Sequence, residues 1–319
     1  MFFNRYRPPD PSWWHGRVDA PTPQRVHERI LCQNITELFA IDRPAFGILG
    51  FACDEGIFRN QGKRGAEQGP RAFREAFGSL PCPQATLYDC GDILCEDGGL
   101  ELSQMALKEG IALLLRQGIF PLVIGGGHEL AWGHYQGIRE VYPNDRLTII
   151  NLDAHFDCRP FNSLGTSGTS FSQIYLDCKE NQREFDVICL GLQEGSNTEA
   201  LFARAKEMGM QYVTSSQFPP NLDLLLSRSE KIYLTICLDV FAFAFAPGVS
   251  APQPLGIMPS QALPILEQIF ETGKLISFDI AELSPKFDRD QMTAALAAQL
   301  ALSSVKKISK AFTSLSRDC

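Results

Sequence analysis

The feature of this sequence that most restricts its fold is a series of short apolar runs separated by segments of helical character. The runs occupy residues 45–51, 85–91, 119–124, 147–152, 185–192, 231–238 and 274–280. Each has the length of one buried strand, and intervening segments such as 103–118 and 290–304 favour helix. Strands that alternate with helices form parallel β-α-β units. The sequence therefore predicts an α/β protein: a three-layer α/β/α sandwich with a mostly parallel sheet of about eight strands.

No linker divides the chain, so we expect its 319 residues to contain a single domain over residues 45–319. Residues 1–44 carry prolines and tryptophans, with one short helical segment at 23–39. We expect them to form an irregular N-terminal extension that packs on the domain. A basic, glycine-rich loop at 54–66 follows the first strand, and Gly69-Pro70 then opens a helix.

Charge and composition limit the kind of partner. The net charge of −8 disfavours a general binder of nucleic acids or anionic membranes. The chain start lacks a signal-peptide pattern, and no apolar run approaches the length of about 18 residues that crosses a bilayer. The ten cysteines include no Cys-x-x-Cys pair, and several lie in apolar runs, which is typical of reduced thiols. We expect a cytoplasmic protein with a small-molecule ligand and no nucleic-acid or membrane partner.

Three metal-binding side chains follow the apolar run 147–152. They are Asp153, His155 and Asp157, which point to one side if the chain stays extended. Gathering carboxylates on one side costs like-charge repulsion, which a divalent cation relieves. Each residue alone is explained as well by a helix cap, a solvated carboxylate or a core histidine. Together on one face, the three predict a metal site.

Other predicted strands also end in polar groups. His128 follows the glycines 125–127, and Cys237 and Asp239 alternate at the end of the sixth run. The carboxyl ends of parallel strands share one edge of the sheet, where ligands bind. Two histidines, three aspartates and a possible thiolate exceed the needs of one Zn²⁺ and suit two ions about 3.5–4 Å apart. Mixed imidazole and carboxylate ligation favours Mn²⁺, with Fe²⁺, Co²⁺ and Zn²⁺ as alternatives.

Four segments of the chain together resemble one enzyme family. They are Gly125-Gly-Gly-His-Glu129, Asn151-Leu-Asp-Ala-His-Phe-Asp157, the loop from Leu238 to Pro252 and the segment from Phe278 to Pro285. This combination resembles the ureohydrolase family of arginases, agmatinases and formimidoylglutamases over residues 45–305. Within the family, segments 157–160, 167–171, 246–252 and 278–287 are most similar to formimidoylglutamases.

The resemblance implies an arginase-like fold, two Mn²⁺ ions per subunit and a homo-oligomeric assembly. It also implies hydrolysis of a C–N bond in a linear amidine or guanidine. A formimidoylglutamase converts N-formimidoyl-L-glutamate and water into L-glutamate and formamide in histidine degradation, with a hydroxide between the metals as nucleophile. Each matching residue is given a role: His128 and Asp157 hold one metal, His155 and Asp239 hold the other, Asp153 bridges them, and Glu282 faces the cationic amidine.

Two positions depart from the family pattern. Cys237 stands where the family usually has an aspartate that bridges the metals. A thiolate there would change the ion preference and add sensitivity to oxidation, which leaves the occupancy of the second metal open. Phe171 stands where arginases place a histidine used in proton transfer, which leaves Asp157 as the general acid.

The two carboxylates of the expected substrate call for cationic partners. Arg159 lies two residues beyond a predicted metal ligand, and Arg59 and Arg64 lie in the basic glycine-rich loop. With Glu282, these arginines are the predicted substrate-binding residues. The alternative for each arginine is an ordinary surface position.

Two other functions remain open at this stage. An arginase, agmatinase or guanidino-acid hydrolase would share the metal site and differ in the loops that contact the far end of the substrate. A catalytically impaired homologue that only binds metal is the second alternative, because of Cys237. Activity on N-formimidoyl-L-glutamate, compared with arginine, agmatine and guanidinobutyrate, separates these possibilities.

Overall fold

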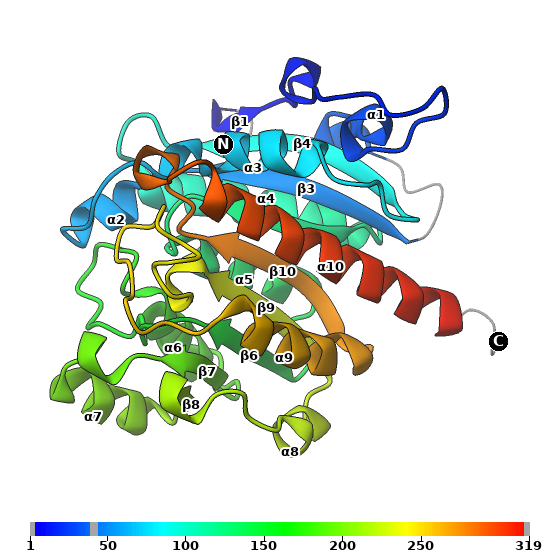
Figure 1. Ribbon diagram of the computed structural model, residues 1–319. Coiled ribbons are helices and arrows are strands. Elements are labelled where there is room, and N and C mark those ends of the chain that lie inside the picture. Colours follow the sequence, from blue (N-terminus) through cyan, green and yellow to red (C-terminus); the bar gives the residue numbers. More distant parts are fainter. Residues whose placement is uncertain (1–3, 39–43, 316–319) are drawn as a thin grey trace.

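The computed structural model describes residues 4–38 and 44–315 and shows a three-layer α/β/α arrangement (Figure 1). The end of the predicted helix 23–39 and residues 316–319 lie outside these ranges. Within them the sheet has ten strands, and every pair is parallel except β1 with β4. The strand order is β1 (Tyr6–Arg7), β4 (Thr86–Leu94), β3 (Ala45–Ala52), β5 (Phe120–Gly125), β10 (Leu275–Ala281), β9 (Lys231–Cys237), β6 (Leu147–Leu152), β7 (Asp186–Leu192) and β8 (Gln211–Thr214), with β2 (Leu31–Cys32) also paired to β4.

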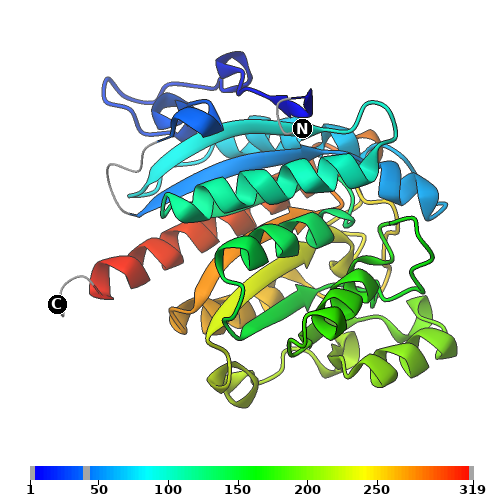
Figure 2. The ribbon, with the colours of Figure 1, turned by 180° about the vertical axis from the view of Figure 1, so that it is seen from behind.

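Helices cover both faces of the sheet. One face carries α3 (Gly69–Gly78), α8 (Asp223–Ser227), α9 (Pro259–Glu271) and α10 (Met292–Leu315). The other face, seen in Figure 2, carries α4 (Leu100–Arg116), α5 (Leu130–Val141), α6 (Ser170–Glu180) and α7 (Glu199–Met208). None of the helices in the described part of the chain is long and apolar enough to cross a membrane.

Each face of the sheet has its own hydrophobic core. Ile48 of β3 packs into the core under α3, α9 and α10, while its neighbour Leu49 packs into the core under α4 and α5. Leu122 and Val123 of β5 divide in the same way. A strand that is buried on both faces needs apolar side chains at successive positions, which explains the continuous apolar runs of the sequence.

The predicted α/β/α sandwich is confirmed, but the sheet has ten strands instead of about eight. The three additional strands, β1, β2 and β8, have only two to four residues each, too few to form a recognisable apolar run. The predicted helix at 23–39 is wrong in extent. Its described residues contain α1 (Val26–Arg29) and a separate 3-10 turn at Ile35–Glu37, because Leu31 and Cys32 between them pair with Tyr88 and Asp89 of β4.

The basic segment 54–66 is also more regular than an open loop. It contains the short helix α2 (Glu55–Arg59) before the chain enters α3, which begins at Gly69 as predicted. The last helix reaches Leu315, well beyond the predicted end at residue 304. Segment 4–38 lies along β4, and Trp14 Nε1 donates a hydrogen bond of 2.7 Å to Asp89 Oδ2. The division of the chain into an extension and a domain at residue 44 stays a prediction.

A buried ion cluster joins α3 to β4. Arg74 is 0% exposed and its Nε and Nη2 donate to the two carboxylate oxygens of Asp89 at 2.9 and 2.8 Å. Its Nη1 donates to Asp92 Oδ1 at 2.7 Å, and Nη2 also reaches the carbonyl of Gly91. Asp89 and Asp92 are likewise buried. The cluster therefore satisfies three buried charges with one bidentate and one single contact.

Candidate metal centre

Four neighbouring strands carry the polar groups that the sequence singled out. In the order β5, β10, β9 and β6, their carboxyl ends lead into His128, Glu282, Cys237 with Asp239, and the segment 153–157. Because these strands are parallel and adjacent, residues from four distant parts of the sequence meet at one edge of the sheet. The strand order thus explains why the predicted donors converge.

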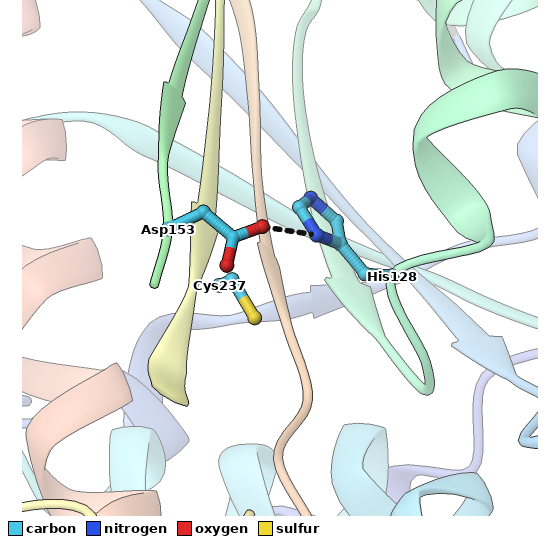
Figure 3. A group of neighbouring side chains, drawn as sticks. All are labelled: His128, Asp153 and Cys237. Carbon is cyan, nitrogen blue, oxygen red and sulfur yellow. Dashed lines mark ion pairs between the residues drawn. The ribbon is translucent and has the colours of Figure 1, made fainter. Parts of the chain in front are cut away.

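One group of donors surrounds His128. Its Nδ1 lies 3.0 Å from Asp153 Oδ2 and 2.9 Å from Asp157 Oδ2. The sulfur of Cys237 belongs to the same group, since donor atoms of His128, Asp153 and Cys237 all lie within 4.8 Å of one another. Figure 3 shows Asp153 and His128 facing each other, with Cys237 beside them; the three residues lie at or just beyond the carboxyl ends of β6, β5 and β9. Imidazole, carboxylate and thiolate are all common transition-metal ligands.

A second group shares Asp153 with the first. His155 Nδ1 lies 3.1 Å from Asp239 Oδ2 and 3.5 Å from Asp153 Oδ1. The donor atoms of Asp153, His155 and Asp239 again lie within 4.8 Å of one another. Asp153 therefore directs one carboxylate oxygen toward each histidine. This is the arrangement expected of a carboxylate placed between two ions.

The sequence prediction assumed an extended chain from Asp153 to Asp157. In the structure, the side chains of this segment converge because the chain turns there. Strand β6 ends at Leu152, and the Asp153 carboxylate then accepts a hydrogen bond of 2.8 Å from the backbone N–H of His155. This local bond folds the chain back in an Asx-type turn. Asp157 has a φ of 44° and Glu282 a φ of 68°, which is uncommon for residues with a side chain. Such backbone conformations cluster at functional sites.

The glycines before His128 permit a close backbone approach. The N–H groups of Gly126 and Gly127 donate to the carbonyls of Phe51 and Cys53 at 2.9 Å each. A Cβ atom at Gly126 would lie only 1.9 Å from the Cys53 carbonyl oxygen. Neither glycine has a positive φ, so the requirement is for space and not for an unusual conformation. This contact fixes His128 against the end of β3.

Hydrogen bonding orients the imidazole of His128. Thr235 Oγ1 donates to Asp279 Oδ1 at 2.6 Å, so its oxygen is left to accept from His128 Nε2, 2.9 Å away. The proton of the neutral imidazole then resides on Nε2, and the lone pair of Nδ1 faces Asp153 and Asp157. An outer partner that fixes the tautomer in this way is typical of histidines that bind metals.

The electrostatics of the cluster show an excess of negative charge. Burial raises the pKa of Asp157 and of Asp239, and the charge of Asp153 raises both further. Burial and Asp239 raise the pKa of Glu282 to about 7. Burial also raises the pKa of the Cys237 thiol well above its usual value, as do Asp153 and Asp239. Divalent cations would neutralise this repulsion and stabilise the charged forms.

Donor atoms in the described part of the chain also lack hydrogen-bond partners. His128 Nδ1 and Asp239 Oδ1 are buried, yet neither makes a contact with hydrogen-bond geometry. Buried polar atoms without a partner are costly, and in a native structure they call for an explanation such as an ion. Their chemistry suits the ligand set of a transition metal. The residues present therefore match the two-metal centre that the sequence predicts.

A cleft of about 180 Å³ opens onto the two donor groups. Its lining includes Glu282, whose carboxylate accepts from the hydroxyl of Ser250 at 2.7 Å and from the His128 N–H at 3.2 Å. Arg159 also lines the cleft, and the lining within the described residues contains no other arginine or lysine. Besides the predicted metal ligands Asp157 and Asp239, the cleft thus holds the carboxylate of Glu282 for a cation and the guanidinium of Arg159 for an anion.

The structure places Arg59 and Arg64 outside the cleft. Neither residue lines the cleft, and both guanidinium groups are paired with carboxylates. Arg59 contacts Glu55 at 3.1 Å and Glu101 at 2.5 Å, while Arg64 contacts Asp54 at 2.8 Å. The sequence showed the positive charge of this segment but not the acidic residues that neutralise it. The structure thus places both arginines in ion pairs outside the cleft, and a role for them in substrate binding stays an untested prediction.

Sequence reasoning missed several residues that build the site. Asn197 donates to the carbonyl of Ala154 at 2.9 Å and accepts from the N–H of Phe156 at 3.2 Å, so it braces the loop of Asp153 and His155. Thr235 and Asp279, which orient His128, were also missed. Thr235 lies two residues before Cys237 on β9, and this alternation was the available signal. Nothing in the sequence pointed to Asn197.

The fold and the site together define an α/β/α protein with a candidate two-metal centre at the carboxyl edge of its sheet. The sequence matches the Arginase family over residues 44–306. The chain therefore belongs to the arginase family.

Two curated relatives that match most of the chain are formimidoylglutamases. The chain is 43% identical to a formimidoylglutamase of Geobacillus thermodenitrificans over 308 residues, which covers 92% of this chain and 94% of the relative. It is 39% identical to a formimidoylglutamase of Clostridium tetani over 329 residues, with coverage of 96% and 97%.

Solved structures share the fold. The formimidoylglutamase of Bacillus subtilis superposes with a TM-score of 0.76 at 20% identity, covering 92% of this chain and 94% of that one. A formiminoglutamase of Trypanosoma cruzi, solved with Mn²⁺, superposes with a TM-score of 0.74 at 24% identity, covering 88% and 98%.

Proposed function

We propose that this protein hydrolyses the formimidoyl C–N bond of N-formimidoyl-L-glutamate, giving L-glutamate and formamide. The observation that carries the proposal is the convergence of two donor groups, which share Asp153, in one cleft with Glu282 and Arg159. The identity to curated formimidoylglutamases over most of the chain supports the choice of substrate. This sequence identity supports the choice of substrate more strongly than the fold does, because arginases share the fold.

Two Mn²⁺ ions per subunit are the proposed cofactors. His128 and Asp157 would hold one ion, His155 and Asp239 the other, and Asp153 would serve both, with Cys237 as an additional donor. When bound, a pair of divalent cations makes hydroxide available at neutral pH and polarises the bond to be attacked.

The remaining side chains position the substrate. Glu282 would pair with the cationic formimidoyl group, and Arg159 with a carboxylate of the glutamate part; both residues line the cleft. The oxygen of water adds to the formimidoyl carbon, and the bond from this carbon to the glutamate nitrogen then breaks. Asp157 is proposed to take up a proton from the attacking water and to give it, as general acid, to this nitrogen as it leaves.

Turnover by metal-reconstituted protein tests the proposal directly. We expect release of glutamate from N-formimidoyl-L-glutamate, and far slower reaction with arginine, agmatine or guanidinobutyrate. A preference for one of these guanidines would assign the chain to another branch of the family. Bound metal without turnover on any of the four compounds would instead indicate a metal-binding homologue that has lost activity.

Glu282→Gln should reduce kcat/KM for N-formimidoyl-L-glutamate by about 10- to 100-fold, because a neutral amide cannot pair with the cationic amidine as a carboxylate does. The amide can still contact Ser250, so metal content should stay at the wild-type level. Steady-state kinetics and elemental analysis measure the two quantities. An unchanged kcat/KM would remove Glu282 from the substrate site.

Arg159→Ala should raise the KM for N-formimidoyl-L-glutamate by about tenfold or more, because one substrate carboxylate loses a charge-assisted contact. Arg64→Ala is the matched control. It removes an equally basic side chain that is paired with Asp54 outside the cleft, and its KM should stay at the wild-type value. Equal effects of the two substitutions would point to a general charge effect and against a contact by Arg159.

Two further proposals concern the setting of the enzyme. We expect it to work in the cytoplasm, where thiols such as that of Cys237 stay reduced. Assembly into a homo-oligomer, which the family resemblance implies, stays a prediction.

A further inference from the structure

The two donor groups of the centre differ in one chemical respect. The group of Asp153, His155 and Asp239 offers only nitrogen and oxygen. The group of His128, Asp153 and Cys237 offers sulfur as well (Figure 3). Both groups contain one histidine and both use Asp153, so the sulfur is what distinguishes them.

The position of Cys237 sets it apart from other buried thiols near the centre. Among the described cysteines it is the one that lines the cleft, and it also contacts the carboxylate of Asp239. The sulfurs of Cys189 and Cys158 face backbone carbonyls, at 3.4 Å from His155 and 3.8 Å from Leu201. The sulfur of Cys237 is therefore presented to the donors, whereas its neighbours are packed as core residues.

We propose that the two metal positions are chemically unequal, so that the Cys237 position selects a borderline ion such as Zn²⁺ or Co²⁺ and the other position takes Mn²⁺. The proposal rests on the two-metal centre proposed above and specifies its composition. Thiolate sulfur favours zinc-like ions over Mn²⁺, whereas carboxylate and imidazole discriminate between them less. The family's aspartate at this position bridges both ions, but the sulfur here belongs to the group of His128 and Asp153 and is absent from the group of His155 and Asp239. One position with sulfur and one without therefore produce a centre that holds two different metals.

Cobalt titration reports directly on the sulfur. Metal-free, reduced protein is titrated with Co²⁺ without oxygen, and thiolate ligation appears as an intense near-ultraviolet charge-transfer band. We expect this band to grow with one equivalent of Co²⁺ per subunit and to stop there, while a second equivalent binds without adding to it. Cys237→Asp and the smaller change Cys237→Ser should both lose the band. Cys189→Ser should keep it, since that sulfur faces a backbone carbonyl.

Displacement of Mn²⁺ tests the selectivity. Protein loaded with Mn²⁺ is titrated with Co²⁺, and released Mn²⁺ is followed by its electron paramagnetic resonance signal. In the wild type we expect the first Mn²⁺ per subunit to leave at a Co²⁺ concentration at least about tenfold lower than the second Mn²⁺ requires. The charge-transfer band should appear as this first ion leaves. In Cys237→Asp the two steps should move together, because both positions then offer only nitrogen and oxygen.

The outcomes are separable from those of the proposed function. The inequality of the positions would be overturned if two Co²⁺ ions bind without the band, or if the band grows through both equivalents. Either result would leave the hydrolase proposal intact. Release of both Mn²⁺ ions in one step would overturn it too. A normal band with no turnover on N-formimidoyl-L-glutamate would contradict the proposed function and support the inequality.

Discussion

Asp153→Asn is expected to lower turnover of N-formimidoyl-L-glutamate by at least about a thousandfold, which corresponds to the several kcal/mol that a metal centre supplies. Asp153 is the carboxylate that faces both His128 and His155, at 3.0 and 3.5 Å. Asparagine preserves the shape of the side chain but lacks the negative charge that two cations would share. Both metal positions are therefore weakened by one substitution.

Metal content and activity are measured together in this experiment. The variant should bind fewer than two ions per subunit, and circular dichroism should show a folded protein, because the substitution leaves the core volume unchanged. Asp97→Asn, which alters an exposed carboxylate that pairs with Arg5, serves as the control. An Asp153→Asn protein with full metal content and normal turnover would show that Asp153 does not hold the centre together.

Arg74→Ala should lower the free energy of unfolding by about 3–5 kcal/mol, because Asp89 and Asp92 would remain as buried, uncompensated charges. Urea denaturation measures the loss. Arg71→Ala provides a matched control on the same helix, since Arg71 is 57% exposed and its pair with Glu75 should contribute about 0.5 kcal/mol or less. Similar losses for the two variants would mean that the buried cluster contributes little.

Arg74→Lys adds an independent check. Lysine keeps the positive charge but cannot make the bidentate contact with Asp89. We expect its stability to lie between those of wild type and Arg74→Ala. A lysine variant as unstable as the alanine variant would assign the stabilisation to geometry and not to charge.

Much of the fold could be predicted because both faces of the sheet are buried. Two-sided burial requires continuous apolar runs, and those at 119–124, 147–152 and 231–238 correspond closely to β5, β6 and β9. Strands of two to four residues, such as β2 and β8, leave no such signal. The helix predicted at 23–39 failed because Leu31 and Cys32 pair with β4, and a partner distant in sequence cannot be read from local propensity.

The candidate site could be predicted where donors follow a strand directly, as Asp153 follows β6 and Glu282 follows β10. The order that makes these strands neighbours could not be read from the sequence, because pairing depends on the whole packed sheet. The ion pairing of Arg59 could not be read from the sequence for the same reason. Its partner Glu101 lies 42 residues away, and only the folded chain brings the two charges together.

The four strands that carry the candidate donors lie inside the sheet, with a paired neighbour on each side. Local opening of a protein begins where few neighbours hold the backbone, and here the edges are formed by β1, β2 and β8. The amide protons of β9 and β10 are therefore expected to exchange with solvent only when the whole domain unfolds. Fraying at the edges would leave the distances among His128, Asp153 and Asp239 unchanged.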